Sequence, residues 1–144
     1  MIDYYKKERN VFAEAIRLNK AAVFEALAAA GITDVAVTFD GCGDSGQIQE
    51  MNAYISGTKV EIPKGPITIY EPSHIGDEEP LETTENTLSQ VLEALCYDCL
   101  GERHSGWEID DGSFGDFTFN VATRVIHLEY NGRFTDVFTE REEF

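Results

Sequence analysis

The sequence has no apolar run long enough to cross a membrane. A membrane-spanning helix needs about 20 consecutive apolar residues, whereas the longest small-apolar stretch, residues 26–30, is short and directly follows Glu25. The first seven residues also lack the apolar segment and the small-residue cleavage site of a secretory signal. We therefore expect a cytoplasmic protein that does not bind membranes.

Cysteine is scarce, and its three copies are an odd number. Secreted disulfide frameworks normally use an even number of cysteines, so this count argues against that class of protein. The chain has 144 residues, and 42% of them are hydrophobic. This length and composition predict one folded domain with one core, spanning residues 1–144.

Basic residues are also scarce, because 11 Lys and Arg stand against 27 Asp and Glu, for a net charge of −16. Residues 1–31 contain five basic and four acidic residues, so the excess of acid lies almost wholly in residues 32–144. A surface with this charge repels nucleic acid and anionic lipid and attracts basic partners. The same charge also favours solubility on its own, and both interpretations stay open.

The hydrophobic pattern indicates an α+β domain. Helical spacing extends over residues 4–30, as one long helix or as two with a break near Asn19, and over about 84–100. Alternating patterns predict strands at residues 33–40, 58–62, 67–70, 114–121 and 125–130, and residues 47–56 could supply a strand that returns beside the first. We expect an antiparallel sheet of about four or five strands, with the N-terminal helix (or helix pair) and the second helix packed on one face. Residues 1–10 are expected to fray, and residues 135–144 to form an acidic tail.

A glycine-rich turn, Gly-Cys-Gly-Asp-Ser-Gly, occupies residues 41–46. Glycines supply the positive φ angles of a tight turn, and Asp and Ser side chains bond the local backbone. Two functional alternatives use the same segment. One makes Ser45 a nucleophile activated by a histidine and an acid, and the other places a cation on Asp40, Asp44 and Glu50.

Cys96 and Cys99 form a CxxC pair, and His104 follows five residues later. Such a pair commonly supplies half of a zinc site. It also lies within the helical pattern of residues 84–100, where a small buried thiol is an ordinary core residue. We favour the core interpretation and expect neither a metal nor another cofactor.

The densest polar segment is residues 104–117, with a histidine, the only tryptophan, four carboxylates and three glycines. In a functional interpretation Trp107 is a platform, and His104 and Glu108 are acid–base groups or ligands. In a structural interpretation Trp107 anchors the chain to the core and the glycines shape the entry into a hairpin. We favour the structural interpretation and assign no catalytic residue. An alternative site would unite Asp40, Asp44, Ser45, His104, Trp107 and Glu108.

The acidic runs lead to the main functional hypothesis. Such runs are usually solvated charge, but a carboxylate-rich face can imitate duplex DNA, which carries about one charge per 1.7 Å of its axis. A mimic of this kind would bind a basic protein surface and would not bind nucleic acid directly. The candidate partner-binding residues are Asp77, Glu78, Glu79, Glu108, Asp110, Asp111 and Asp116.

Two blocks of sequence resemble a known family. The first comprises AAAGIT at 28–33, VTFDG at 37–41 and GDSGQI at 43–48, and the second comprises YD at 97–98, HSGWE at 104–108, DG at 111–112, GDFTF at 115–119 and NGRF at 131–134. In these blocks the chain is similar to a family of short acidic bacterial proteins of unknown function that often occur on mobile elements. The family usually has glycine at the position of Ser105, and the three cysteines lie outside its pattern. The resemblance implies no catalytic residues. By analogy with small acidic phage and plasmid proteins, it suggests a block on host-defence nucleases.

Three hypotheses follow. The leading one is a non-enzymatic interaction protein that docks on a basic, nucleic-acid-binding surface, such as that of a host-defence or DNA-processing complex. The second is a small hydrolytic or metal-dependent enzyme with its site between the 40–46 turn and the 104–116 loop. The third is a structural or regulatory module that oligomerises through its N-terminal helix. The sequence does not fix the oligomeric state.

Overall fold

A computed structural model describes residues 2–42, 45–72, 81–104, 106–107, 112–133 and 137–144. Its elements are α1 (Ile2–Ala29), β1 (Asp34–Cys42), β2 (Ser45–Ile55), β3 (Thr58–Val60), β4 (Pro66–Pro72), β5 (Leu81–Thr87), α2 (Leu88–Arg103), β6 (Ser113–Asn120), β7 (Val125–Arg133) and β8 (Val137–Glu143). The fold is therefore α+β, as the hydrophobic pattern predicts.

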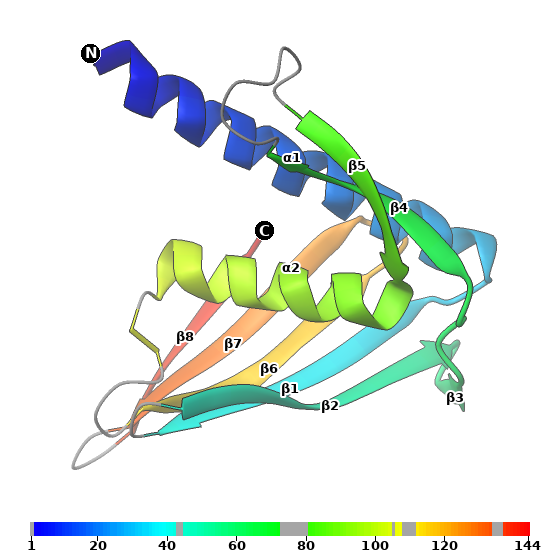
Figure 1. Ribbon diagram of the computed structural model, residues 1–144. Coiled ribbons are helices and arrows are strands. Elements are labelled where there is room, and N and C mark those ends of the chain that lie inside the picture. The colour runs from blue at the N-terminus through cyan, green and yellow to red at the C-terminus, as the bar shows by residue number, and fades with distance from the viewer. Residues whose placement is uncertain (1, 43–44, 73–80, 105, 108–111, 134–136) are drawn as a thin grey trace.

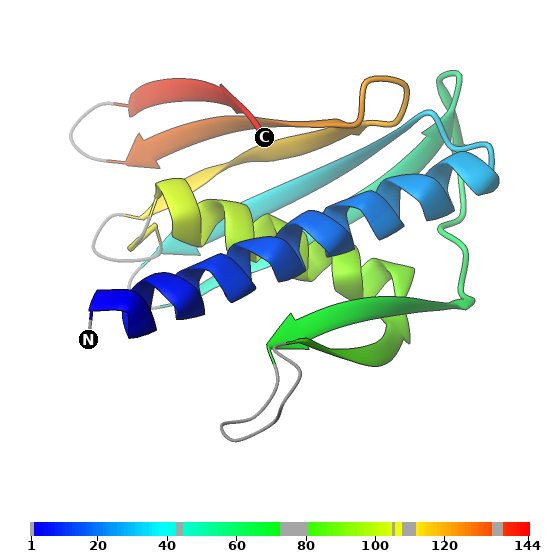
Figure 2. The same cartoon turned by 90° about the horizontal axis from the view of Figure 1, so that it is seen from above.

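The main sheet has six antiparallel strands in the order β3-β2-β1-β6-β7-β8. It is larger than the four or five strands expected, and β4 and β5 form a separate two-stranded sheet. Both helices lie on the same side of the main sheet, with α2 directly above the strands (Figures 1 and 2). We call this side the inner face and the opposite side the outer face.

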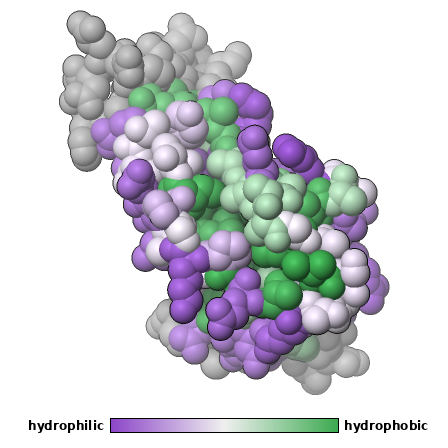
Figure 3. All heavy atoms as spheres, turned by 90° about the vertical axis from the view of Figure 1, so that its right-hand side faces the viewer, coloured by the Kyte–Doolittle hydropathy of each residue, from purple (hydrophilic) through white to green (hydrophobic). Residues whose placement is uncertain are grey.

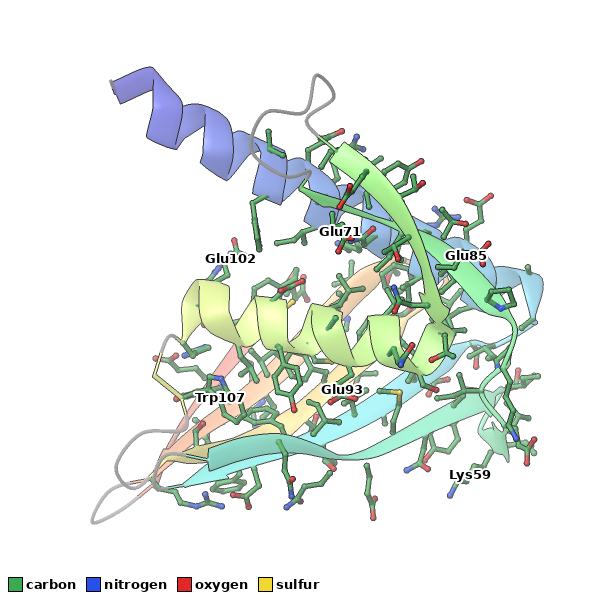
Figure 4. All side chains as sticks on the ribbon, in the orientation of Figure 1. Lys59, Glu71, Glu85, Glu93, Glu102 and Trp107 are labelled. Atoms are coloured by element: carbon green, nitrogen blue, oxygen red, sulfur yellow. The ribbon has the colours of Figure 1, made fainter. Side chains whose placement is uncertain are left out.

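The core lies between the inner face and the helices. Side chains alternate across a strand, and the inward positions of β1, β6 and β7 are apolar and buried: Val35, Val37, Phe39, Phe117, Phe119, Ile126, Leu128 and Tyr130. They pack against the buried face of α2 and against Val23, Phe24 and Leu27 of α1. The intervening residues of the same strands point to the outer face, away from both helices (Figure 4).

The ends of the helices follow from local chemistry. α1 is a single helix that ends before Gly31, whose φ of +75° suits glycine, and the Ile32 N–H donates to the Leu27 carbonyl at 3.0 Å. α2 begins at Leu88, later than the expected start near 84, because residues 84–87 pair with β4 as a strand. Thr87 and Gln90 then form a reciprocal capping box at its N-terminus.

The β4–β5 hairpin is attached to the middle of α1. The Asn19 side chain donates to the Tyr70 carbonyl at 2.8 Å, and the Tyr70 N–H donates to the Asn19 side-chain oxygen at 2.7 Å. The amide of Asn19 thereby acts as a partner for the strand edge, and the helix continues through this position without a break. An edge covered by a helix is protected from pairing with another chain.

The segment expected to be an acidic tail forms the edge strand β8 instead. It pairs with β7 from His127↔Glu143 to Arg133↔Val137. The Phe144 N–H then donates to the Ile126 carbonyl at 2.8 Å. Charged residues on both faces of β8 hide the alternation by which a half-buried strand is normally recognised.

Within the described ranges, no helix has both the length and the apolar character that crossing a membrane requires. At the end of the molecule where β3 lies, apolar side chains are visible between hydrophilic ones (Figure 3). Ile55, next to β3 in the sheet, is 38% exposed. Single exposed apolar residues of this kind are normal on protein surfaces.

Candidate functional site

One polar cluster lies at the C-terminal end of α2, on the inner face of the sheet. We call His104, Tyr130, Glu140 and Glu142 the inner cluster. His104 is the C-cap of α2, and its backbone N–H donates to the Leu100 carbonyl at 2.7 Å. Its ring stacks on Tyr130 with centroids 3.7 Å apart and planes 8° from parallel. The helix end and the tyrosine ring together fix the direction of the imidazole.

Two carboxylates of β8 face this imidazole. Glu140 pairs with Tyr130 and Glu142 with Leu128, so both side chains point to the inner face. The Glu142 carboxylate lies 2.8 Å from His104 Nε2, and the Glu140 carboxylate lies 3.7 Å from Nδ1. The His104 side chain is 8% exposed, against 20% for Glu142 and 51% for Glu140. One side of the cluster is therefore closed, and the Glu140 side opens to solvent.

The inner cluster has the composition of a possible cation site. One ligand atom each from His104, Glu140 and Glu142 lie within 4.8 Å of one another. In the part of the chain that the structure describes, this is the one such set of His, Cys, Asp and Glu residues. Sequence reasoning selected His104 but missed both glutamates. The available signal was their spacing of two residues, which places them on one face of a strand.

A second set of carboxylates lies on the outer face. Glu50, Thr38, Asp116, Glu129 and Arg141 form one cross-strand row over β2, β1, β6, β7 and β8. We call its three carboxylates the outer row. Burial, and then the charge of Glu129, raise the pKa of Asp116 above its usual range. Arg141 lies 3.4 Å from Glu129 but is 74% exposed, so this pair contributes little.

Asp40 also lies on the outer face, where it holds an arginine. The Arg133 guanidinium donates to both Asp40 carboxylate oxygens at 2.9 and 2.8 Å, and to the Gly41 carbonyl at 3.1 Å. It also lies 4.7 Å from the centre of the Phe114 ring. The hydrogen bond from Arg133 lowers the pKa of Asp40. These contacts join β1, β6 and β7 in the sheet, which is a structural role.

The alternative site proposed from the sequence is not assembled around Asp40 and His104. The two segments are neighbours, because Asp40 pairs with Phe114 and Gly41 with Ser113. However, Asp40 points to the outer face, whereas His104 stacks on Tyr130 at the inner face. The sheet therefore separates the two side chains. The side chains of Asp44, Ser45 and Glu108 lie outside the described residues.

Trp107 anchors the chain that leaves α2. Its ring lies edge-on to Phe39 with centroids 5.7 Å apart, and 6.1 Å from the Tyr97 ring. The Ser113 hydroxyl donates to the Trp107 carbonyl at 2.7 Å. The Trp107 side chain lies between the end of α2 and the sheet (Figure 4). These contacts support the structural interpretation of this residue.

Cys96 and Cys99 are core residues, as we expected. They are 0% and 6% exposed, and both are free thiols. Burial raises the pKa of Cys99 to about 12 and that of Cys96 well above its usual value. Since a metal binds the thiolate, these residues are poor ligands. The cation set described above contains no cysteine.

The predicted partner-binding residues are mostly outside the described part of the chain. Asp77, Glu78, Glu79, Glu108, Asp110 and Asp111 all lie there. Asp116 is described, and it lies in the outer row. Sequence reasoning did not count the other two members, Glu50 and Glu129, among the partner-binding residues, and it named Glu50 only as a candidate cation ligand with Asp40 and Asp44. Strand alternation could have identified both glutamates as outward-pointing residues. Their alignment with Asp116 depends on the register between strands, which the sequence does not show.

A groove of about 900 Å³ separates α1 from the C-terminal half of α2. Phe12 and Ile16 of α1, Leu95 of α2 and Phe144 line it, and Phe12 is 54% exposed. Asp98 also lines the groove, and burial raises its pKa to about 6.

Comparison with known proteins gives one match. The model of a family of unknown function (DUF6878) matches residues 15–144. The searches of curated proteins and of solved structures gave no match.

Proposed function

Since the chain belongs to the DUF6878 family, whose function is unknown, we propose a function from the geometry: a non-enzymatic interaction protein that docks its outer sheet face on a basic protein surface. The observation that carries the proposal is the outer row. It gathers Glu50, Asp116 and Glu129 from three strands on a face that points away from both helices.

Electrostatics supports a cationic partner. Asp116 and Glu129 are directly opposite on adjacent strands, and like charges in such positions destabilise a sheet. The pKa of Asp116 is raised first by burial and second by this repulsion from Glu129. A lysine or arginine of a partner would relieve the repulsion between these two carboxylates. This relief would favour binding of a cationic partner.

The repeated negative charge of the row supports a partner that normally binds nucleic acid. Neighbouring strands lie about 4.8 Å apart, and Glu50 is separated from Asp116 by β1. The carboxylates therefore lie at intervals of about one and two strand spacings. These intervals, about 5 and 10 Å, are wider than the roughly 3.4 Å rise per phosphate along one DNA strand. The row therefore resembles nucleic acid in its repeated negative charge and not in its spacing.

The test compares two triple variants that have the same net charge. The first reverses the outer row with Glu50→Lys, Asp116→Lys and Glu129→Lys. The second reverses exposed carboxylates of α1, β5 and α2 with Glu25→Lys, Glu85→Lys and Glu93→Lys. Each tagged protein captures partners from a lysate at about 50 mM salt. The capture is repeated at about 500 mM salt, where screening is strong, and with excess duplex DNA.

The proposal expects a DNA-binding protein to be captured by the parent and by the second variant, and to be released by salt and by DNA. The outer-row variant should lose it, with the affinity reduced severalfold or more. Equal retention by both variants, or equal loss from both, would show that the outer row is not the binding surface. Circular dichroism establishes that each variant is folded.

A further inference from the structure

We propose that the inner cluster is a zinc-type divalent cation site, in which His104, Glu140 and Glu142 bind one ion between the end of α2 and the edge strand β8. This proposal is independent of the proposed interaction function, because it concerns the opposite face of the sheet. The cation would connect His104 to glutamates that lie 36 and 38 positions further along the chain.

The ligand set fits this class of ion. One imidazole nitrogen and two carboxylate oxygens are three protein ligands, the number typical of zinc sites that keep a fourth position open. In a tetrahedral zinc site, ligand atoms at about 2.1 Å from the metal are about 3.4 Å from one another. Here the ligand atoms lie within 4.8 Å, and the nearest pair is 2.8 Å apart. Binding therefore requires only small side-chain rotations.

The protein already holds two of the three ligands in place. The His104 ring is pressed on Tyr130 and is 8% exposed, and Glu142 is 20% exposed. Glu140 is half exposed, so it can turn toward an ion and leave a path for its entry. Because His104 and Glu142 are already held in place, only the Glu140 side chain has to be ordered when the ion binds. This reduces the entropic cost of binding.

Charge gives an independent reason for a cation. Two glutamates of an edge strand point inward at one imidazole, which neutralises at most one of them. A divalent ion would balance both carboxylates. The competing explanation is an ion pair without metal, in which inward-pointing charges merely protect the edge strand from aggregation.

The chain offers a matched control on the outer face. His127 Nδ1 lies 3.5 Å from the Glu143 carboxylate, and these side chains are 44% and 71% exposed. This pair has the same two residue types, with its glutamate on the same strand β8. It belongs to no set of three potential ligands among the described residues. His127→Gln and Glu143→Gln therefore control for His104→Gln and Glu140→Gln.

The experiment measures ZnCl2 binding by calorimetry and by the melting temperature. All proteins contain Cys42→Ser, which removes a competing thiol, and MgCl2 serves as the hard cation that prefers six oxygen ligands. We expect one zinc ion per chain. At a hundredfold excess over Kd we expect the melting temperature to rise by about 5–10 °C. Magnesium should give no rise.

The variants decide between the cation site and the simple ion pair. Glu140→Gln removes the exposed ligand, which should leave the metal-free protein folded, and it should weaken zinc binding at least about tenfold. His104→Gln should weaken zinc binding further, and the two outer-face controls should stay within about twofold of the parent. Absence of zinc binding in the parent, or equal affinity in the inner and outer variants, would overturn the proposal.

Discussion

The two faces of the β7–β8 hairpin each bring a histidine close to glutamate of β8, in very different surroundings. On the inner face, His104 contacts Glu142 at 2.8 Å and stacks on Tyr130. On the outer face, His127 lies 3.5 Å from Glu143, and these side chains are 44% and 71% exposed. The residue types are the same, so the difference lies in burial and in the neighbouring rings.

This comparison shows that position decides what an ion pair does. An exposed pair is screened by water and contributes about 0–1 kcal/mol. A pair in which one partner is buried and oriented by a ring is strongly constrained, and removal of either group leaves the other without compensation. This difference underlies the two proposals, a ligand site on the inner face and transient contact with a partner on the outer face.

The largest expected difference between the two faces is in how much a substitution lowers the free energy of unfolding, because only the inner face is packed against the helices. Phe39 contacts the rings of Phe117, Tyr130 and Trp107 on the inner face. Phe39→Ala should reduce the free energy of unfolding by about 3–5 kcal/mol. Glu50→Ala, on the outer face, should change it by less than about 0.5 kcal/mol. Urea unfolding measures both, and equal effects would remove the distinction between the faces.

The two histidines give the next largest difference. His104→Ala removes the stacking on Tyr130 and leaves the mostly buried Glu142 without its nearest partner. We expect a loss of about 1–3 kcal/mol in the free energy of unfolding. His127→Ala should cost less than about 0.5 kcal/mol. Thermal unfolding of the metal-free proteins at one pH tests this, and a larger loss from His127→Ala would contradict the comparison.

A half-buried carboxylate on the helix side provides a pH test. Burial raises the pKa of Asp98 from 3.8 to about 6. Between these values the folded state binds more protons than the unfolded state, so stability falls as pH rises from about 4 to 6 and then levels off. Asp98→Asn should remove this fall and stabilise the protein at pH 7 by about 1 kcal/mol, allowing for solvent screening. Unfolding of both proteins from pH 4 to 7 measures it, and parallel curves would contradict the assignment.

Much of the fold could be predicted from the sequence because its central strands are simple. In β1, β6 and β7 apolar and polar residues alternate, and the inward positions are the buried ones. Residues 47–56 were left open as a strand that could return beside β1, and the structure has this pairing. The sheet was expected to be smaller because β8 carries glutamates on both faces and resembles an exposed tail.

The candidate sites were harder to predict, since each depends on register between distant strands. His104 was selected, but Glu140 and Glu142 reach it only because β8 pairs with β7 in one particular alignment. The alternative site would have brought Asp40 and His104 together. The segments that carry them are adjacent, yet strand alternation turns Asp40 to the outer face, whereas His104 caps α2 above the inner face. Partner binding by the acidic residues stays a prediction.

The smallest expected effect links stability to the proposed function on the outer face. Burial and the charge of Glu129 raise the pKa of Asp116, so the charged form of Asp116 makes the folded state slightly less stable. Because Asp116 is exposed, solvent screening keeps the effect small. Asp116→Asn should therefore stabilise the protein by at most about 0.5 kcal/mol at neutral pH. The gain should disappear as pH falls below about 4, where the unfolded state also binds the proton.

The same substitution should weaken capture of the basic partner, because it removes one charge of the outer row. A protein that is more stable but binds less well would show that the carboxylates of this face are retained for binding at a cost in stability. Urea unfolding at pH 7 and at pH 4, together with the capture assay, gives both quantities. A loss of stability at pH 7, or unchanged capture, would separate Asp116 from the function proposed for its face.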